Sequence, residues 1–240
     1  MPIYQHQATV ETEDGPMSMF MSYPEGPGPF PAVFVISGQP GPATPEFLGA
    51  ERLAQHGYVG VVPDLLHRGP TVHAYAEQGP RRRALADQQT IADMNAAMSY
   101  LQSQPYIQAN NLGITGFCMG GRVAFMMAAL RPEFRAAVDC YGGGILQGIG
   151  GPAPIESTAN IHCPVLVLNG EADTVCTVDE VNQVVAELNK FGKVNEVHWY
   201  PGADHAFMAR GPKEDMEDAW ARSLAWFDRY LVRTPALAQA

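Results

Sequence analysis

The stretch Gly116-Phe117-Cys118-Met119-Gly120-Gly121-Arg122 is the most informative part of this chain, because it contains the pattern G-x-C-x-G. Apolar residues typical of a short buried strand precede it, and Val123, Met127 and Leu130 follow at helical spacing. A G-x-C-x-G pattern between a strand and a helix is typical of a nucleophile elbow, a sharp turn that exposes a reactive side chain. The glycines fit this turn because it leaves little room for side chains. We therefore predict that Cys118 is a nucleophile at the positive end of a helix.

Two loops further along the chain offer partners for this thiol. The apolar strand pattern at residues 165–168 leads into a loop that contains Asp173, and the strand pattern at residues 196–200 leads into a turn that contains His205. The order nucleophile, acid, histidine is the chain order of α/β-hydrolases. A plainer interpretation of each residue alone is a buried cysteine, a turn aspartate and a surface histidine. Three such loops in the required order favour a catalytic triad of Cys118, Asp173 and His205.

With these residues the chain resembles the dienelactone hydrolase family. The matching features are the elbow at residues 116–121, Pro63-Asp64-Leu65, the G-x-x-D loop that ends at Asp173, and His198-Trp199-Tyr200 before the H-x-F motif of His205-Ala206-Phe207. They extend from roughly residue 30 to residue 231, which is nearly the whole chain. The resemblance implies an α/β-hydrolase fold, with a mostly parallel central sheet and helices on both faces. It also implies a hydrolase of lactones or small activated esters, whose substrate becomes an acyl thioester on the cysteine.

The chain departs from this family's pattern in one loop. The best-known members carry a glutamate after the first long core strand, where it contacts the resting thiol. Here the loop reads Ser37-Gly38-Gln39-Pro40-Gly41, and glutamine is the nearest match. A neutral amide cannot take a proton from sulfur. We therefore expect His205 and the elbow helix to activate the thiol, and the departure puts dienelactone itself in doubt as a substrate.

The roles of the site residues follow from this arrangement. Cys118 attacks the acyl carbon, His205 takes the thiol proton and later activates water, and Asp173 orients the imidazole. The oxyanion needs two donors, which we predict to be the backbone N–H of Met119 and an N–H of Gln39, because Pro40 has none.

Four residues are candidates for substrate binding. A guanidinium pairs well with a carboxylate, and the resemblance places arginines near Arg81 and Arg210. Phe207 and Tyr141 are candidates for an apolar pocket wall. Each arginine fits a solvated surface as well, and each aromatic ring fits the core.

The composition limits the class of protein. The chain has 240 residues, 15 basic against 25 acidic residues and a net charge of -10, and no basic tract that would favour nucleic acid. No run approaches the roughly 18 apolar residues of a membrane helix, and the first residues do not resemble a signal peptide. The four cysteines form no C-x-x-C pair, and His67 and His73 belong to no recognisable metal set. We expect a single cytoplasmic domain, 1–240, with no cofactor, no metal, no nucleic-acid or membrane partner, and a small-molecule ester or lactone as substrate.

The apolar periodicity predicts an N-terminal hairpin at residues 9–13 and 17–23, a strand at 32–36, and then alternating helices and strands. The expected helices cover residues 45–55, 83–102, 120–130, 178–190 and 215–231, and the expected strands lie near Val59, Leu112, Ala136, Val165 and Glu196. Two other functions remain open at this point. The chain could be a non-catalytic relative that binds a small molecule, or Cys118 could be a redox-active thiol.

Overall fold

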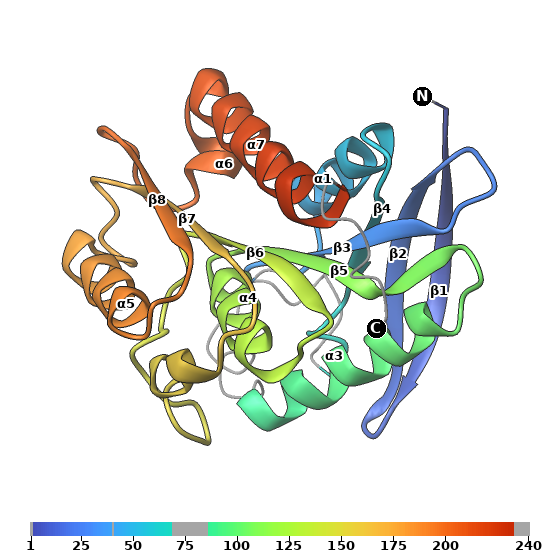
Figure 1. Ribbon diagram of the computed structural model, residues 1–240, viewed down its shortest axis with the longest axis horizontal. Helices are drawn as coiled ribbons and strands as arrows, with labels where there is room; N and C mark the ends of the chain where they lie inside the picture. Colours follow the sequence, from blue (N-terminus) through green and yellow to red (C-terminus); the bar gives the residue numbers. More distant parts are fainter. Residues whose placement is uncertain (1, 40, 69–85, 233–240) are drawn as a thin grey trace.

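The computed structural model describes residues 2–39, 41–68 and 86–232, and its centre is an eight-stranded sheet. The strand order is β1-β2-β4-β3-β5-β6-β7-β8 (Figure 1). The hairpin of β1 and β2 is antiparallel, β2 also pairs antiparallel with β4, and the pairings from β4 across to β8 are parallel. The strands are β1 (Ile3–Thr12), β2 (Gly15–Pro24), β3 (Phe30–Ile36), β4 (Val59–Pro63), β5 (Ile107–Phe117), β6 (Phe134–Cys140), β7 (Val165–Gly170) and β8 (Asn195–Tyr200).

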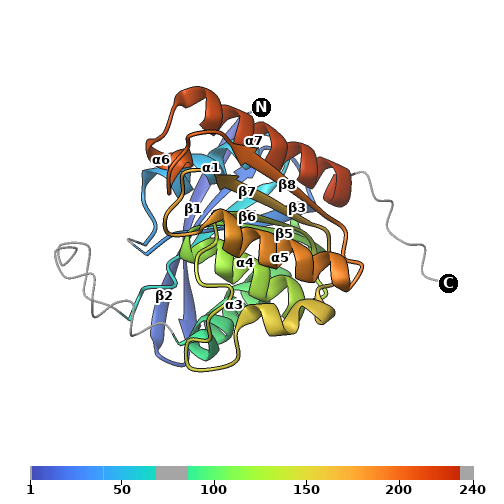
Figure 2. The same cartoon turned by 90° about the vertical axis from the view of Figure 1, so that its left-hand side faces the viewer.

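Helices cover both faces of this sheet. In Figures 1 and 2, α1, α6 and α7 lie on one face, and α3, α4 and α5 lie on the other. The helices are α1 (Thr44–Gln55), α3 (Asp87–Gln102), α4 (Met119–Leu130), α5 (Val178–Lys190), α6 (Phe207–Arg210) and α7 (Lys213–Phe227), with a 3-10 helix η2 (Pro154–Asn160) and a π-helical end η3 (Asp228–Val232). A mostly parallel sheet between two helical layers is the predicted α/β-hydrolase fold, and the prediction is confirmed.

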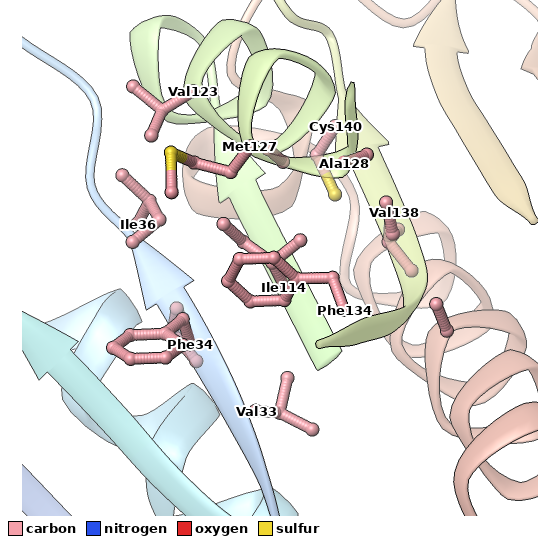
Figure 3. Packing of buried hydrophobic residues seen from close by; sticks show 14 of the residues in the cluster. Val33, Phe34, Ile36, Ile114, Val123, Met127, Ala128, Phe134, Val138 and Cys140 are labelled. Carbon is pink, nitrogen blue, oxygen red and sulfur yellow. The ribbon is translucent and has the colours of Figure 1, made fainter. Parts of the chain in front are cut away.

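The core lies on both faces of the central strands. Every residue of β4 is buried, as are the six residues after Phe30 in β3. A strand covered on both faces must be apolar throughout, which explains its continuous apolar sequence. In Figure 3, Met127 of α4 lies over Ile36 and Ile114, and the rings of Phe34 and Phe134 pack edge to face, with ring centroids 5.9 Å apart. This packing fixes α4, and therefore the elbow at its start, against β3 and β5.

The structure confirms most expected elements and changes their ends. The hairpin is longer than predicted, β5 begins at Ile107, and α5 has the predicted bounds, with a capping box in which the Glu180 N–H donates to Thr177 Oγ1 at 3.3 Å. The last helix begins at Lys213 and changes from α- to π-helix at Asp228. The expected start at residue 83 lies outside the described residues. The short helices η2 and α6 were not predicted.

Candidate active site

Cys118 occupies a tight turn between β5 and α4. Its φ of 56° and ψ of -115° are rarely adopted by a residue with a side chain, and such strain is typical of functional positions. A Cβ atom at Gly116 would overlap the carbonyl of Gly120, and one at Gly120 would overlap the carbonyl of Ile36. Both glycines are therefore required by close backbone approach, as the elbow pattern predicted. The geometry is that of a nucleophile elbow.

Asp173 and His205 meet beside this turn. The Nδ1–H of His205 donates to Oδ2 of Asp173 at 2.8 Å. The other oxygen of Asp173 accepts the backbone N–H groups of Val175 and Cys176, each at 2.8 Å. Asp173 follows β7 and His205 follows β8, so the parallel sheet brings the two loops to one edge. The side chain of Asp173 is fully buried and that of His205 is 14% exposed, so this contact is shielded from water.

The electrostatics of the pair keep both groups charged. Burial tends to raise the pKa of Asp173, but the hydrogen bonds from His205 and from two backbone N–H groups outweigh it, and the pKa is lowered. Burial tends to lower the pKa of His205. Its hydrogen bonds with Asp173 and Cys118 outweigh this effect and raise the pKa to about 9. At neutral pH the imidazole is therefore held as imidazolium between the carboxylate and the sulfur.

Cys118 and His205 line a cavity of about 660 Å³. Its lining also includes Gln39, Tyr141 and Arg210, which are three of the residues predicted from the sequence. The remaining walls are largely apolar and come from α1, α6 and α7 and from the strand ends. This volume lies within the usual range for small-molecule sites.

Two other predicted site residues, Phe207 and Met119, do not belong to the cavity lining. Phe207 is buried behind Tyr141, with ring centroids 5.4 Å apart, and it does not belong to the cavity lining. Met119 is the first residue of α4, where a backbone N–H has no partner within the helix. Arg81 and His73 lie outside the described residues. His67 contacts the buried carboxylate of Asp93 at 3.2 Å.

Sequence reasoning missed Glu46 and Trp220, both of which line the cavity and are largely buried. Glu46 stands in the first turn of α1, where an acidic residue is ordinary, and Trp220 belongs to the apolar stripe of α7. Neither pattern indicates which face of the helix meets a cavity. In the described residues, no three His, Cys, Asp or Glu side chains are grouped to hold a metal ion. None of the helices in these ranges is long and apolar enough to cross a bilayer.

An elbow cysteine, a buried aspartate and a histidine at the edge of a parallel sheet define an enzyme of the α/β-hydrolase class. A family model of the dienelactone hydrolase family matches residues 17–231. The chain therefore belongs to the dienelactone hydrolase family, and the predicted hydrolase class is confirmed.

Individual relatives agree with this assignment. A carboxymethylenebutenolidase of Rhodococcus opacus is 29% identical over 76% of this chain and 75% of its own length. The crystal structure of a candidate dienelactone hydrolase from Klebsiella pneumoniae is 29% identical, covers 96% of this chain and 100% of its own, and superposes with a TM-score of 0.88. A dienelactone hydrolase structure from Anabaena variabilis shares the fold, with a TM-score of 0.77, 19% identity, and coverage of 96% of this chain and 100% of its own.

Proposed function

We propose that this enzyme hydrolyses lactones or small activated carboxylic esters through an acyl thioester on Cys118. The observation that carries the proposal is the 2.8 Å hydrogen bond between His205 and the buried Asp173, beside a cysteine in a strained elbow and within one cavity. The names of the relatives, carboxymethylenebutenolidase and dienelactone hydrolase, support a lactone or ester as substrate. We further propose that one cytoplasmic domain carries this activity.

Acylation begins with the sulfur of Cys118 as a thiolate, whose proton His205 has taken. It attacks the acyl carbon, the new bond is C–S, and the bond that breaks is the C–O bond of the ester. The imidazolium of His205 gives its proton to the departing alkoxide. Asp173 holds the ring in the orientation that allows this transfer. The developing oxyanion would be stabilised by the N–H of Met119 and the N–H of Gln39.

Deacylation uses the neutral imidazole that remains. His205 takes a proton from water, the hydroxide formed attacks the thioester, and the C–S bond breaks. The carboxylic acid leaves, and the sulfur and the imidazolium return to their resting state. We propose that Arg210, at the exposed mouth of the cavity, pairs with a carboxylate of the substrate, and that Tyr141 forms part of the wall. Phe207 would act indirectly, by supporting Tyr141.

The test is the hydrolysis of 4-nitrophenyl acetate by the parent and by Cys118→Ala. We expect rapid hydrolysis by the parent, no hydrolysis above background by Cys118→Ala, and an acetylated Cys118 peptide in quenched reactions. Cys163→Ala is a matched control because Cys163 is a buried thiol and does not line the cavity.

The same experiment separates the other two functions. An inactive parent that still binds the ester would indicate a non-catalytic relative. A parent whose Cys118 is readily oxidised by peroxide but is never acylated would indicate a redox thiol. Either result contradicts the proposal.

A further inference from the structure

The cavity contains a carboxyl group that the proposed reaction does not use. Glu46 projects from the first turn of α1, is 7% exposed, and lines the same cavity as Cys118 and His205. Its Oε2 accepts the backbone N–H of Ala43 at 2.9 Å. An acidic residue at this helix position normally remains in water. There it can make the same capping contact without the free-energy cost of losing its hydration. The capping contact alone therefore does not explain why the carboxyl of Glu46 is buried.

Glu46 lines the cavity together with Cys118, Tyr141 and His205. Burial, and then the charges of neighbouring groups that include Cys118 and Glu46, raise the pKa of Tyr141. The ring of Tyr141 in turn contacts that of His205, with centroids 5.2 Å apart. Glu46 is thus within electrostatic reach of the group that packs on the catalytic imidazole. Burial raises the pKa of Glu46, and the backbone N–H groups of Glu46 and Ala43, which favour the carboxylate, oppose this rise. Because a carboxylate can accept about four hydrogen bonds, these two donors leave acceptor capacity for a ligand.

Aromatic rings accompany this carboxylate. Phe117, Tyr141 and Trp220 all line the cavity, and all three are largely buried. The guanidinium of Arg52 already lies over the Trp220 ring, 5.7 Å from the ring centroid, which leaves Phe117 and Tyr141 as the other rings. The combination of aromatic rings with a buried carboxylate is the chemistry that binds an ammonium or quaternary ammonium group. It is unfavourable to a second carboxylate, which would meet like charge in a medium of low polarity.

The two arginines of the cavity do not cancel this negative charge. Arg52 is already paired with Glu217, through two hydrogen bonds of 2.6 and 2.9 Å. Arg210 lies on the exposed surface of α6 and has no ion-pair partner among the described residues. The imidazolium of His205 also lines the cavity, and the buried carboxylate of Asp173 balances its charge. Among the described residues, Glu46 and Arg210 are therefore the charged groups of the lining that have no ion-pair partner.

We propose that Glu46 is a specificity-determining residue, which makes the interior of the cavity select acyl groups that end in a cationic centre. The inference rests on the proposed esterase function, since it names a substrate class for that same site. It is compatible with a carboxylate at Arg210, because the two charges lie at different parts of the cavity.

The test uses three 4-nitrophenyl esters of equal acyl length that differ in terminal charge. They are the esters of 4-(trimethylammonio)butanoate, of its neutral isostere 5,5-dimethylhexanoate, and the anionic monoester of glutarate. The parent should have a higher kcat/KM for the cationic than for the neutral ester. In Glu46→Gln, which keeps the size of the side chain and an acceptor for Ala43, this ratio should fall about tenfold, as expected for the loss of one charge several ångströms away. The ratio of the anionic to the neutral ester should rise.

Glu51→Gln is the matched control, because it removes a carboxylate from the same helix without touching the cavity lining. It should retain the parental ratios. Equal ratios in the parent and in folded Glu46→Gln would overturn the inference. If Glu46→Gln did not fold, a parent that fails to prefer the cationic over the neutral ester would overturn it equally.

A separate measurement distinguishes this inference from the proposed function. Calorimetry with Cys118→Ala and the unreactive amides of the same cationic and neutral acids measures binding without chemistry. Tighter binding of the cationic amide supports the role of Glu46 even where no ester is hydrolysed. Tighter binding of the neutral amide contradicts it even where hydrolysis is fast.

Discussion

His205 and Asp173 should contribute unequally to turnover, because one moves the proton and the other holds the ring that moves it. His205→Ala removes the acid and base and should lower kcat by about 10³-fold. Asp173→Asn keeps the shape of the contact and should lower kcat by a smaller factor. Steady-state kinetics on a neutral ester measures both effects, with circular dichroism as the check on folding. Turnover close to the parental rate in a folded His205→Ala protein is incompatible with the proposed triad.

Gln39 lies in the cavity lining with Cys118 and His205, at the place where this chain departs from its family's pattern. In Gln39→Glu a new carboxylate should repel ionised sulfur and attract the imidazolium. Alkylation of Cys118 by iodoacetamide should therefore be slower than in the parent across the neutral range. Gln39→Met is the uncharged control of similar length and should react at close to the parental rate. Identical rates in all three proteins would mean that residue 39 does not approach the sulfur.

The sequence could predict that the three residues of the proposed triad lie at the same edge of the sheet, but it could not predict that Glu46 lines the cavity. Cys118, Asp173 and His205 each follow a strand pattern, and parallel strands bring their carboxyl ends to one edge. Glu46 belongs to a helix, and its spacing from Ala43 is that of a capping contact. Whether such a residue faces water or a cavity depends on how α1 is rotated against α7. The burial of Phe207 behind Tyr141 likewise depends on packing between separate elements.

At the scale of the elements, the elbow holds α4 in contact with β3 through residues that cannot carry a side chain. Gly120→Ala would place a Cβ against the carbonyl of Ile36, so α4 or β3 must shift. We expect a loss of roughly 1 to 3 kcal/mol in the free energy of unfolding, the usual effect of overpacking. Urea denaturation measures it. Gly151→Ala is the control, since nothing lies within 4 Å of its added Cβ. Equal denaturation midpoints for the two variants would contradict the close approach.

The elements that the sequence did not predict lack a periodic signal. Helix α6 has four residues, which is only about one turn, and η2 is a short 3-10 helix. The helix changes from α to π at Asp228. The apolar spacing of Trp220, Leu224, Phe227 and Leu231 nevertheless remains that of a single helix. In contrast, α5 combines a capping box with an apolar stripe, and its bounds were predicted without error. The apolar spacing of a helix can thus be recognised from the sequence, but a change from α-helical to π-helical backbone hydrogen bonding cannot.

At the scale of the whole molecule, the pair of His205 and Asp173 links folding to pH. The pKa of His205 rises from 6.5 to about 9 on folding, so its stabilising contribution is complete below about pH 6.5 and is lost as the pH rises through about 9. The advantage of the parent over His205→Gln in the free energy of unfolding should therefore shrink between these values. Urea midpoints at a series of pH values measure it. A difference in the free energy of unfolding between the parent and His205→Gln that stays constant across this pH range would contradict the prediction.

Asp139, at the end of β6, should produce a pH dependence of stability in the neutral and acidic range. This carboxyl is 3% exposed, and burial, opposed by the N–H of Gly142, raises its pKa from 3.8 to about 7. The folded protein therefore binds a proton between these values that the unfolded chain has already released, and stability falls as the pH rises through this window. In Asp139→Asn the side chain is always neutral, so the free energy of unfolding of the parent should fall relative to that of this variant from about pH 4 to pH 7. Above about pH 7 the difference between the two proteins should stay constant. Glu11→Gln, at an exposed position of β1, is the control for the change in net charge. Parallel stability curves for the parent and Asp139→Asn through that window would show that Asp139 does not take up a proton on folding.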